Sequence, residues 1–232
     1  MNLCLEEMKM LDDTVKEIIN NEKRPEKKAK AIFNFVRDEI KFDIYVDFPD
    51  VGKILKRKAG ACYHKAMVMV EMMKLAGIPA RYHFVWIRKG GLKNILHPLV
   101  YRFWPEKFIH TYAEIKLNNK WIMLDATYDK KLHNKLIKSR LNFSRNKSNE
   151  KLDIDFSLQG SKSAQDLYIV EDAGCGDDLG KLKEHIRELP TFKRISTGSA
   201  GWLSQKQVKK IKKATAFGIS HCSNCKEERT CK

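Results

Sequence analysis

Cys62, His110 and Asp125 have the residue types and the chain order that a thiol-based catalytic site needs. Cys62 follows Gly60-Ala61 and opens an apolar stretch, so we expect its sulfur at the N-terminus of a helix. Unpaired backbone N–H groups and the positive end of the helix dipole favour a thiolate there. A nearby imidazolium favours the thiolate further, and the Cys62 backbone N–H is placed to donate to an oxyanion. The sequence therefore predicts a nucleophile, its base and an aspartate that orients the base.

A predicted hairpin brings the histidine and the aspartate together. Two strand-like runs, 110–117 and 120–127, flank Asn118-Asn119, which is a candidate two-residue turn. In that register His110 and Asp125 are diagonal neighbours on one face of the hairpin, about 5–8 Å apart at Cβ. Tyr112 and Thr127 share this face. The opposite face is apolar and is expected to face the core; it carries Ala113, Ile115, Leu117, Ile122 and Leu124.

Each of these residues also has an ordinary structural interpretation. A lone cysteine that begins an apolar helix is most often a small buried hydrophobe, and a lone histidine at a strand start is most often structural. The joint pattern is more specific than its parts. His64 lies two positions after Cys62, and such positions point about 200° apart on a helix, which argues against His64 as the base. His83 and His97 remain alternatives to His110, but neither has an aspartate that a hairpin places beside it.

The elements that must position the site are helices first and strands after them. Apolar periodicity predicts helices over 4–20, from Pro25 to Ile40, and from near Cys62 to a cap at Gly77, with a loop around Pro49 and Gly52. Runs of β-branched and aromatic residues predict strands over 81–87 and 97–104 before the hairpin. Helices followed by an antiparallel sheet make an α+β fold.

Two segments resemble the transglutaminase-like superfamily: KAGACYHKAMVMVEMMKLAGIPARYHFVWI (58–87) and HTYAEIKLNNKWIMLDATYD (110–129). The first resembles the family's glycine-x-cysteine opening, its helix and its Gly-Ile-Pro-Ala-Arg end. The second resembles the histidine strand, the turn, the tryptophan (Trp121) and the aspartate-x-threonine end. The segment AIFNFVRDEIKFD (31–43) resembles the helix that precedes this core, so the likeness covers residues 25–129.

The resemblance implies a cysteine-protease-like core in which N-terminal helices pack on the antiparallel sheet. It implies that Cys62 is the nucleophile, His110 the general base and acid, and Asp125 the residue that holds the imidazole. The implied reaction is thiol-dependent acyl transfer or hydrolysis at an amide bond of a protein or peptide, of the protease, amidase or transglutaminase type. It proceeds through a thioester and requires no cofactor. The family also has members without activity, so a non-catalytic binding module is the alternative.

Three departures from the family's pattern bear on the site. Ala126 follows the aspartate where the family often has proline, and Thr111-Tyr112 follows the histidine where Ala-Trp is common. No Gln or Trp precedes Cys62, so a side-chain donor for an oxyanion hole has no obvious supplier. Tyr45 and Trp104 are the candidates for this donor.

The chain has 232 residues and a net charge of +16, most of which is carried by two basic stretches in its C-terminal half. Residues 130–151 hold eight Lys or Arg against one Glu, and residues 203–232 hold eight against two Glu. We therefore expect residues 1–129 to form the core with its N-terminal helices, and residues 130–232 to form a basic, partly helical extension. Such segments suggest an acidic partner such as nucleic acid, although a solvated lysine-rich surface is the commoner explanation.

His221, Cys222, Cys225 and Cys231 crowd the C-terminal tail. Cys-x-x-Cys spacing is compatible with structural zinc, but adjacent histidine and cysteine rarely bind one metal, so a tail with free thiols is favoured. Six cysteines in the chain are too sparse for a disulfide scaffold. No stretch reads as a secretory signal or approaches the roughly 20 apolar residues of a membrane span. A cytoplasmic protein with reduced thiols is expected.

Overall fold

A computed structural model of the chain describes residues 5–43, 50–93, 95–96, 98–133, 168–180 and 182–184. The helices are α1 (Leu5–Ile19), α2 (Pro25–Glu39), α3 (Val51–Arg57), α4 (Cys62–Leu75) and α5 (Pro98–Phe103), with a 3-10 helix η1 (Lys89–Leu92). The strands are β1 (Lys41–Phe42), β2 (Ala59–Gly60), β3 (Ala80–Arg88), β4 (Lys107–Leu117), β5 (Lys120–Leu124) and β6 (Ile169–Gly176).

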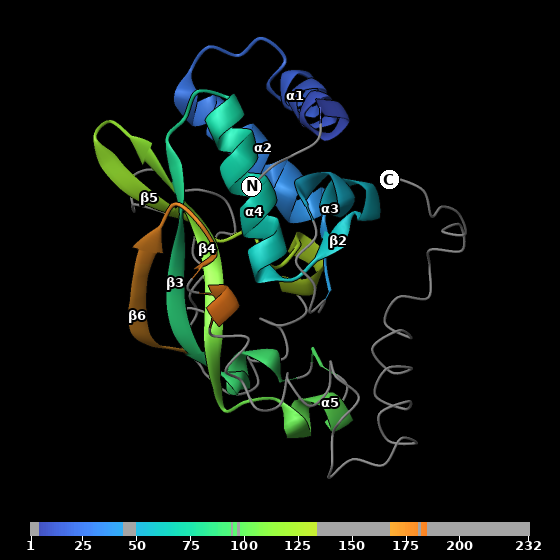
Figure 1. The fold of residues 1–232 in the computed structure, drawn as a ribbon, viewed down its shortest axis with the longest axis vertical. Helices are drawn as coiled ribbons and strands as arrows, with labels where there is room; N and C mark the ends of the chain where they lie inside the picture. The colour runs from blue at the N-terminus through green and yellow to red at the C-terminus, as the bar shows by residue number, and fades with distance from the viewer. Residues whose placement is uncertain are drawn as a thin grey trace.

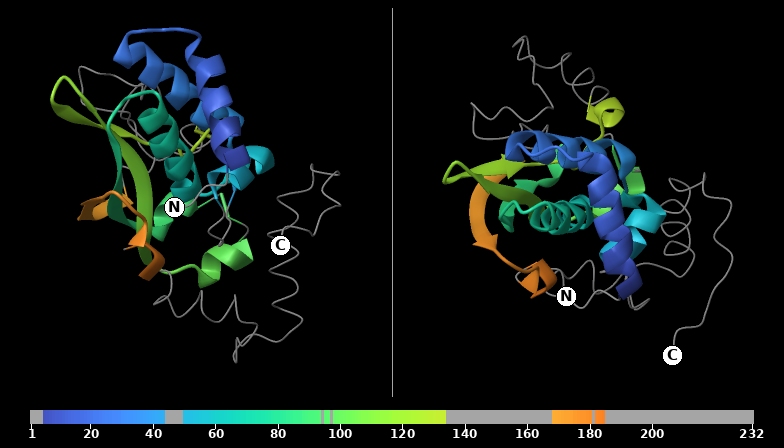
Figure 2. Two further views of the ribbon diagram at one scale, coloured as in Figure 1. Left: turned by 45° about the horizontal axis from the view of Figure 1, so that its top comes forward. Right: turned by 90° about the horizontal axis from the view of Figure 1, so that it is seen from above.

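The sheet and the N-terminal helices form separate layers with α4 between them (Figures 1 and 2). The sheet has the order β5-β4-β3-β6, and each neighbouring pair is antiparallel. The helix α4 packs on β3 and β4 with one side and on α1, α2 and α3 with the other. Two short parallel strands, β1 and β2, join the end of α2 to the start of α4. The predicted α+β fold, with helices packed on an antiparallel sheet, is confirmed.

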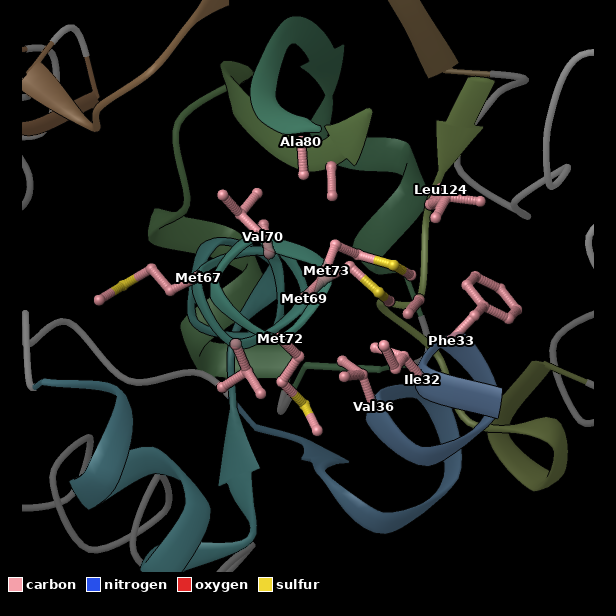
Figure 3. Packing of buried hydrophobic residues seen from close by; sticks show 14 of the residues in the cluster. Ile32, Phe33, Val36, Met67, Met69, Val70, Met72, Met73, Ala80 and Leu124 are labelled. Atoms are coloured by element: carbon pink, nitrogen blue, oxygen red, sulfur yellow. The ribbon is translucent and has the colours of Figure 1, made fainter. Parts of the chain in front are cut away.

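The helix α4 is apolar on nearly every side because it lies at the centre of the core. Its methionines Met67, Met69, Met72 and Met73 are all buried. Figure 3 looks along this helix and shows its side chains spreading toward α2 on one side and the sheet on the other. A helix that is buried all round needs no polar face, so its sequence lacks the amphipathic stripe of a surface helix.

The two ends of α4 are fixed by different devices. At the N-terminus, His64 Nδ1 accepts a hydrogen bond of 3.0 Å from the Ala61 backbone N–H. A Cβ on Gly60 would lie 2.6 Å from His64 Cβ, so only glycine fits there. At the C-terminus, Gly77 has φ +76°, and the Ile78 N–H donates to the Met73 carbonyl at 2.9 Å. This is the glycine cap that the sequence predicts.

The hairpin register of β4 and β5 matches the prediction, but the second strand is shorter than expected. Asn118 and Asn119 have φ values of 48° and 64°, as a type I′ turn requires. Leu117 pairs with Lys120, and Ala113 pairs with Leu124. The ladder ends at this pair, so residues 125–127 leave the strand and are held by other contacts.

Two other sequence predictions were wrong. Residues 97–104 were expected to form a strand, but Pro98–Phe103 is the helix α5, in which proline takes the favoured first position. The region around Gly52 was expected to be a loop, but Val51–Arg57 is the helix α3, whose Lys53 N–H donates to the Asp50 side chain at 2.8 Å. These helices have seven residues or fewer, so apolar periodicity has too few turns in which to appear.

Strand β6 comes from the stretch predicted as the basic extension, yet it forms the fourth strand of the sheet beside β3. Across the described ranges, no helix combines the length and the apolar character that a membrane span requires.

Candidate active site

A buried histidine–aspartate pair lies where β4 passes the end of β5. His110 Nε2 and Asp125 Oδ2 are 2.9 Å apart, and both side chains are 2% exposed. The second carboxylate oxygen, Asp125 Oδ1, accepts the Thr127 backbone N–H at 3.0 Å. Asp125 is therefore fixed on both oxygens, one by the imidazole and one by the chain that follows it.

The electrostatics of the pair favour the charged forms of both partners. Burial alone lowers the pKa of His110, but the charge of Asp125, its hydrogen bond and the Cys62 thiol outweigh burial and raise this pKa. Burial alone raises the pKa of Asp125, but His110 and the bonds from Thr127 lower it well below the usual range. An imidazolium–carboxylate pair is thus the stable state in this dry environment.

Cys62 is the first residue of α4 and is partly exposed. Its thiol is close enough to His110 to raise the pKa of the ring. Because Nε2 is bonded to Asp125, the nitrogen left for Cys62 is Nδ1, which is buried and has no hydrogen-bond partner among the described residues. Cys62 and Asp125 also line one small pocket between α4 and the sheet. The structure brings the three predicted residues together.

The local reason for this meeting differs in part from the predicted one. The expected diagonal pairing needed β5 to continue through Thr127, but the ladder stops at Leu124. His110 still meets Asp125, because the Thr127 N–H turns the carboxylate toward the imidazole. The predicted neighbours are right, and the contact that orients the aspartate is a backbone one beyond the strand.

The structure places the alternative histidines as follows. His64 is fully buried and caps α4, so its ring is turned to the Ala61 backbone. His83 does have carboxylate partners, since its ring nitrogens lie 2.8 Å from Glu114 and 3.0 Å from Asp172. Neither is an aspartate that a hairpin places beside the ring, since Asp172 lies 89 residues later in the chain.

Of the remaining candidate site residues, Trp104 lies within the described part of the chain and the others lie outside it. Trp104 packs edge-on against Phe108, with ring centroids 5.8 Å apart, in a second apolar cluster. Tyr45, His97 and the predicted zinc ligands His221, Cys222, Cys225 and Cys231 lie outside the described residues. Within the described residues, no group of three or more His, Cys, Asp or Glu is arranged to hold a metal ion. Zinc in the tail stays a prediction.

Two pocket residues were missed by sequence reasoning. Thr111 is fully buried, and its hydroxyl has no hydrogen-bond partner among the described residues. Lys65 lies on α4 three positions after Cys62 and is also buried. A lysine in the first turns of a mostly apolar helix was the available signal for the second residue. The threonine was noted only as a departure from the family's pattern, because threonine is ordinary in a strand.

The family model of the transglutaminase-like superfamily matches residues 12–126. No curated protein matches the chain. Among solved structures, one titled "a Putative Cysteine Protease from Cytophaga hutchinsonii" aligns over 74% of this chain and 43% of that one, with 16% identity and a TM-score of 0.44. A second, titled "a TGase", aligns over 64% of this chain and 42% of its own, with 15% identity and a TM-score of 0.41. The chain thus spans less than half the length of these two structures.

Proposed function

Because residues 12–126 place this chain in the transglutaminase-like superfamily, we propose that it is a thiol enzyme that performs acyl transfer or hydrolysis at an amide bond. The observation that carries the proposal is the buried bond between His110 Nε2 and Asp125, which leaves the other ring nitrogen for Cys62. A histidine held by a carboxylate on one side and next to a thiol on the other is suited to make and stabilise a thiolate.

The proposed resting state is an ion pair, in which the thiol proton of Cys62 resides on His110. Asp125 stabilises the imidazolium, and the thiolate attacks the carbonyl carbon of the amide. The Cys62 backbone N–H belongs to the first turn of α4, where N–H groups have no intrahelical partner, and it donates to the oxyanion. His110 then gives its proton to the departing amine, which leaves a thioester on Cys62.

The second half of the proposed reaction resolves the thioester. Water or a second amine attacks it, and neutral His110 takes a proton from that attacking group. The tetrahedral species then expels Cys62 as a thiolate, and the ion pair with protonated His110 is restored. Water gives hydrolysis and an amine gives transfer, so the same residues serve both outcomes. A protein or peptide is the proposed substrate.

Alkylation of Cys62 by iodoacetamide tests the proposal. An ordinary thiol is only about 0.3% thiolate at pH 6, so Cys62 should react on the order of a hundredfold faster than an ordinary thiol at that pH. Peptide mass mapping assigns the label to Cys62, and Cys62→Ala should abolish this fast phase. His110→Ala should slow it to the rate of an ordinary thiol.

Cys175 supplies the matched control for this experiment. It is the other free cysteine in the described ranges, it is also partly exposed, and it lies on β6. Cys175→Ala should leave the fast phase unchanged. Fast labelling that persists in Cys62→Ala, or that does not depend on His110, would contradict the proposed function.

A further inference from the structure

Lys65 is a buried lysine at the centre of the candidate site. It is 1% exposed and lies one helical turn after Cys62 on α4. Its Nζ donates to the Arg37 carbonyl at 3.0 Å and to the Thr127 carbonyl at 3.1 Å. One atom on the nucleophile's helix therefore contacts both α2 and the segment that follows β5.

Full burial of a lysine requires a compensating environment. Burial lowers the pKa of Lys65 to about 7, against the attraction of Asp129, Asp125 and Asp38 and together with repulsion from Lys41. A neutral amine has two N–H donors, which matches the two carbonyl acceptors. The ammonium form is stabilised by the negative charge of the nearby carboxylates. Both carbonyl contacts are available in either form, so the tether does not depend on the charge.

Thr127 connects this lysine to the histidine–aspartate pair. The Thr127 carbonyl accepts from Lys65, while the Thr127 N–H donates to Asp125 Oδ1 at 3.0 Å. Asp125 in turn binds His110 Nε2 at 2.9 Å. A continuous chain of contacts thus runs from the helix of Cys62 through Lys65, Thr127 and Asp125 to the base.

The sheet does not supply this restraint. The β4–β5 ladder ends at Leu124, one residue before Asp125, so ladder hydrogen bonds do not hold the aspartate. Without another contact, the segment 125–127 would be free to move relative to α4. The buried amine of Lys65 joins the two.

We propose that Lys65 is a positioning residue, which holds the Asp125–Thr127 segment against α4 and thereby sets the orientation of His110 toward Cys62. This inference rests on the proposed function. A displacement of about 1 Å in a catalytic site can cost about a hundredfold in rate. Loss of the tether should therefore reduce thiol reactivity far more than loss of ordinary packing does.

Lys65→Met tests the inference, because methionine has a similar length and no hydrogen-bond donor. In the full chain, the fast alkylation of Cys62 at pH 6 should fall on the order of ten- to a hundredfold. The imidazole resonances of His110, followed by NMR against pH, should titrate at a lower pH than in the wild type. This shift is expected because a displaced carboxylate no longer opposes the effect of burial.

Met72→Ala is the matched control. Met72 is fully buried on α4 but lies beyond the pocket, toward the C-terminus of the helix. The substitution should lower stability while leaving the His110 titration and the alkylation rate of folded protein unchanged. If Lys65→Met is too unstable to measure, Lys65→Gln takes its place. The same fall in alkylation rate and the same shift in the His110 titration are expected, because the glutamine amide is too short to reach both carbonyls.

The outcomes separate the two proposals. Wild-type alkylation that depends on His110, together with an unchanged rate and an unchanged His110 titration in folded Lys65→Met or Lys65→Gln, overturns the role of Lys65 alone. Alkylation that does not depend on His110 in the wild type overturns the proposed function, and the role of Lys65 with it.

Discussion

His110 and Asp125 show how two buried side chains can keep opposite charges. Each is penalised by burial, and each is restored by its partner, so the pKa of His110 is raised and that of Asp125 is lowered. The raised pKa of His110 gives stability that is complete below about pH 6.5 and is lost as the pH rises through the higher folded value. The lowered pKa of Asp125 gives stability that is present above about pH 3.9 and is lost as the pH falls through the lower folded value.

Asp125→Asn should therefore lower the free energy of unfolding most between about pH 4 and pH 6.5, by about 3 kcal/mol, because it leaves His110 buried without its counter-charge. Urea denaturation across the pH range measures this difference. Asp172→Asn is the control, since the Asp172 side chain also bonds a histidine but is 67% exposed and should cost about 1 kcal/mol or less. Equal losses in the two variants would contradict the argument.

The two glycines that flank α4 are each required for a different physical reason. Gly60 is required by space, because a Cβ would lie 2.6 Å from His64. Gly77 is required by its φ of +76°, and a Cβ there would meet nothing within 4 Å. One glycine therefore positions the end that carries Cys62, and the other ends the helix away from the site.

Gly60→Ala should displace His64 and the first turn of α4, with a loss of about 1–3 kcal/mol in the free energy of unfolding. It should also slow the alkylation of Cys62. Gly77→Ala should cost about 1 kcal/mol through backbone strain and leave the alkylation rate unchanged. Denaturation and labelling on the same samples check both effects. A loss of reactivity in Gly77→Ala that equals the loss in Gly60→Ala would refute the local assignment.

At the scale of the whole molecule, the net charge of +16 is the main feature that the candidate site does not explain. Two stretches, 130–151 and 203–232, are the most basic. Residues 134–151 of the first stretch and all of the second lie outside the described residues. We propose, as the second candidate activity, that these stretches bind an acidic partner such as nucleic acid.

The affinity of the full chain for a uridine homopolymer should then fall steeply as salt rises. A chain that neutralises six phosphates of a single strand loses about three hundredfold in affinity between 50 and 200 mM salt. Fluorescence anisotropy measures this dependence. Cys62→Ala should leave the affinity unchanged, because the proposed nucleophile is not part of the basic stretches. Absence of binding at 50 mM salt, or binding that does not respond to salt, would exclude this partner.

The sequence by itself determined the features that depend on near neighbours in the chain. The glycine-led start of α4, its Gly77 cap and the Asn118-Asn119 turn follow from local backbone preferences. The turn then sets the register, and the register predicts that His110 and Asp125 are neighbours. The resemblance of 58–87 and 110–129 to a known family added the order of the proposed catalytic residues.

Only the tertiary structure decided what depends on contacts between distant segments. It decided that β5 ends before Asp125, that Asp172 of β6 reaches His83, and that Lys65 joins Arg37 and Thr127. The helices α3 and α5 belong here too, since they are too short for their own periodicity to specify them. For the contacts between distant segments the physical reason is that hydrogen bonds and burial across the fold leave no period or spacing in the sequence.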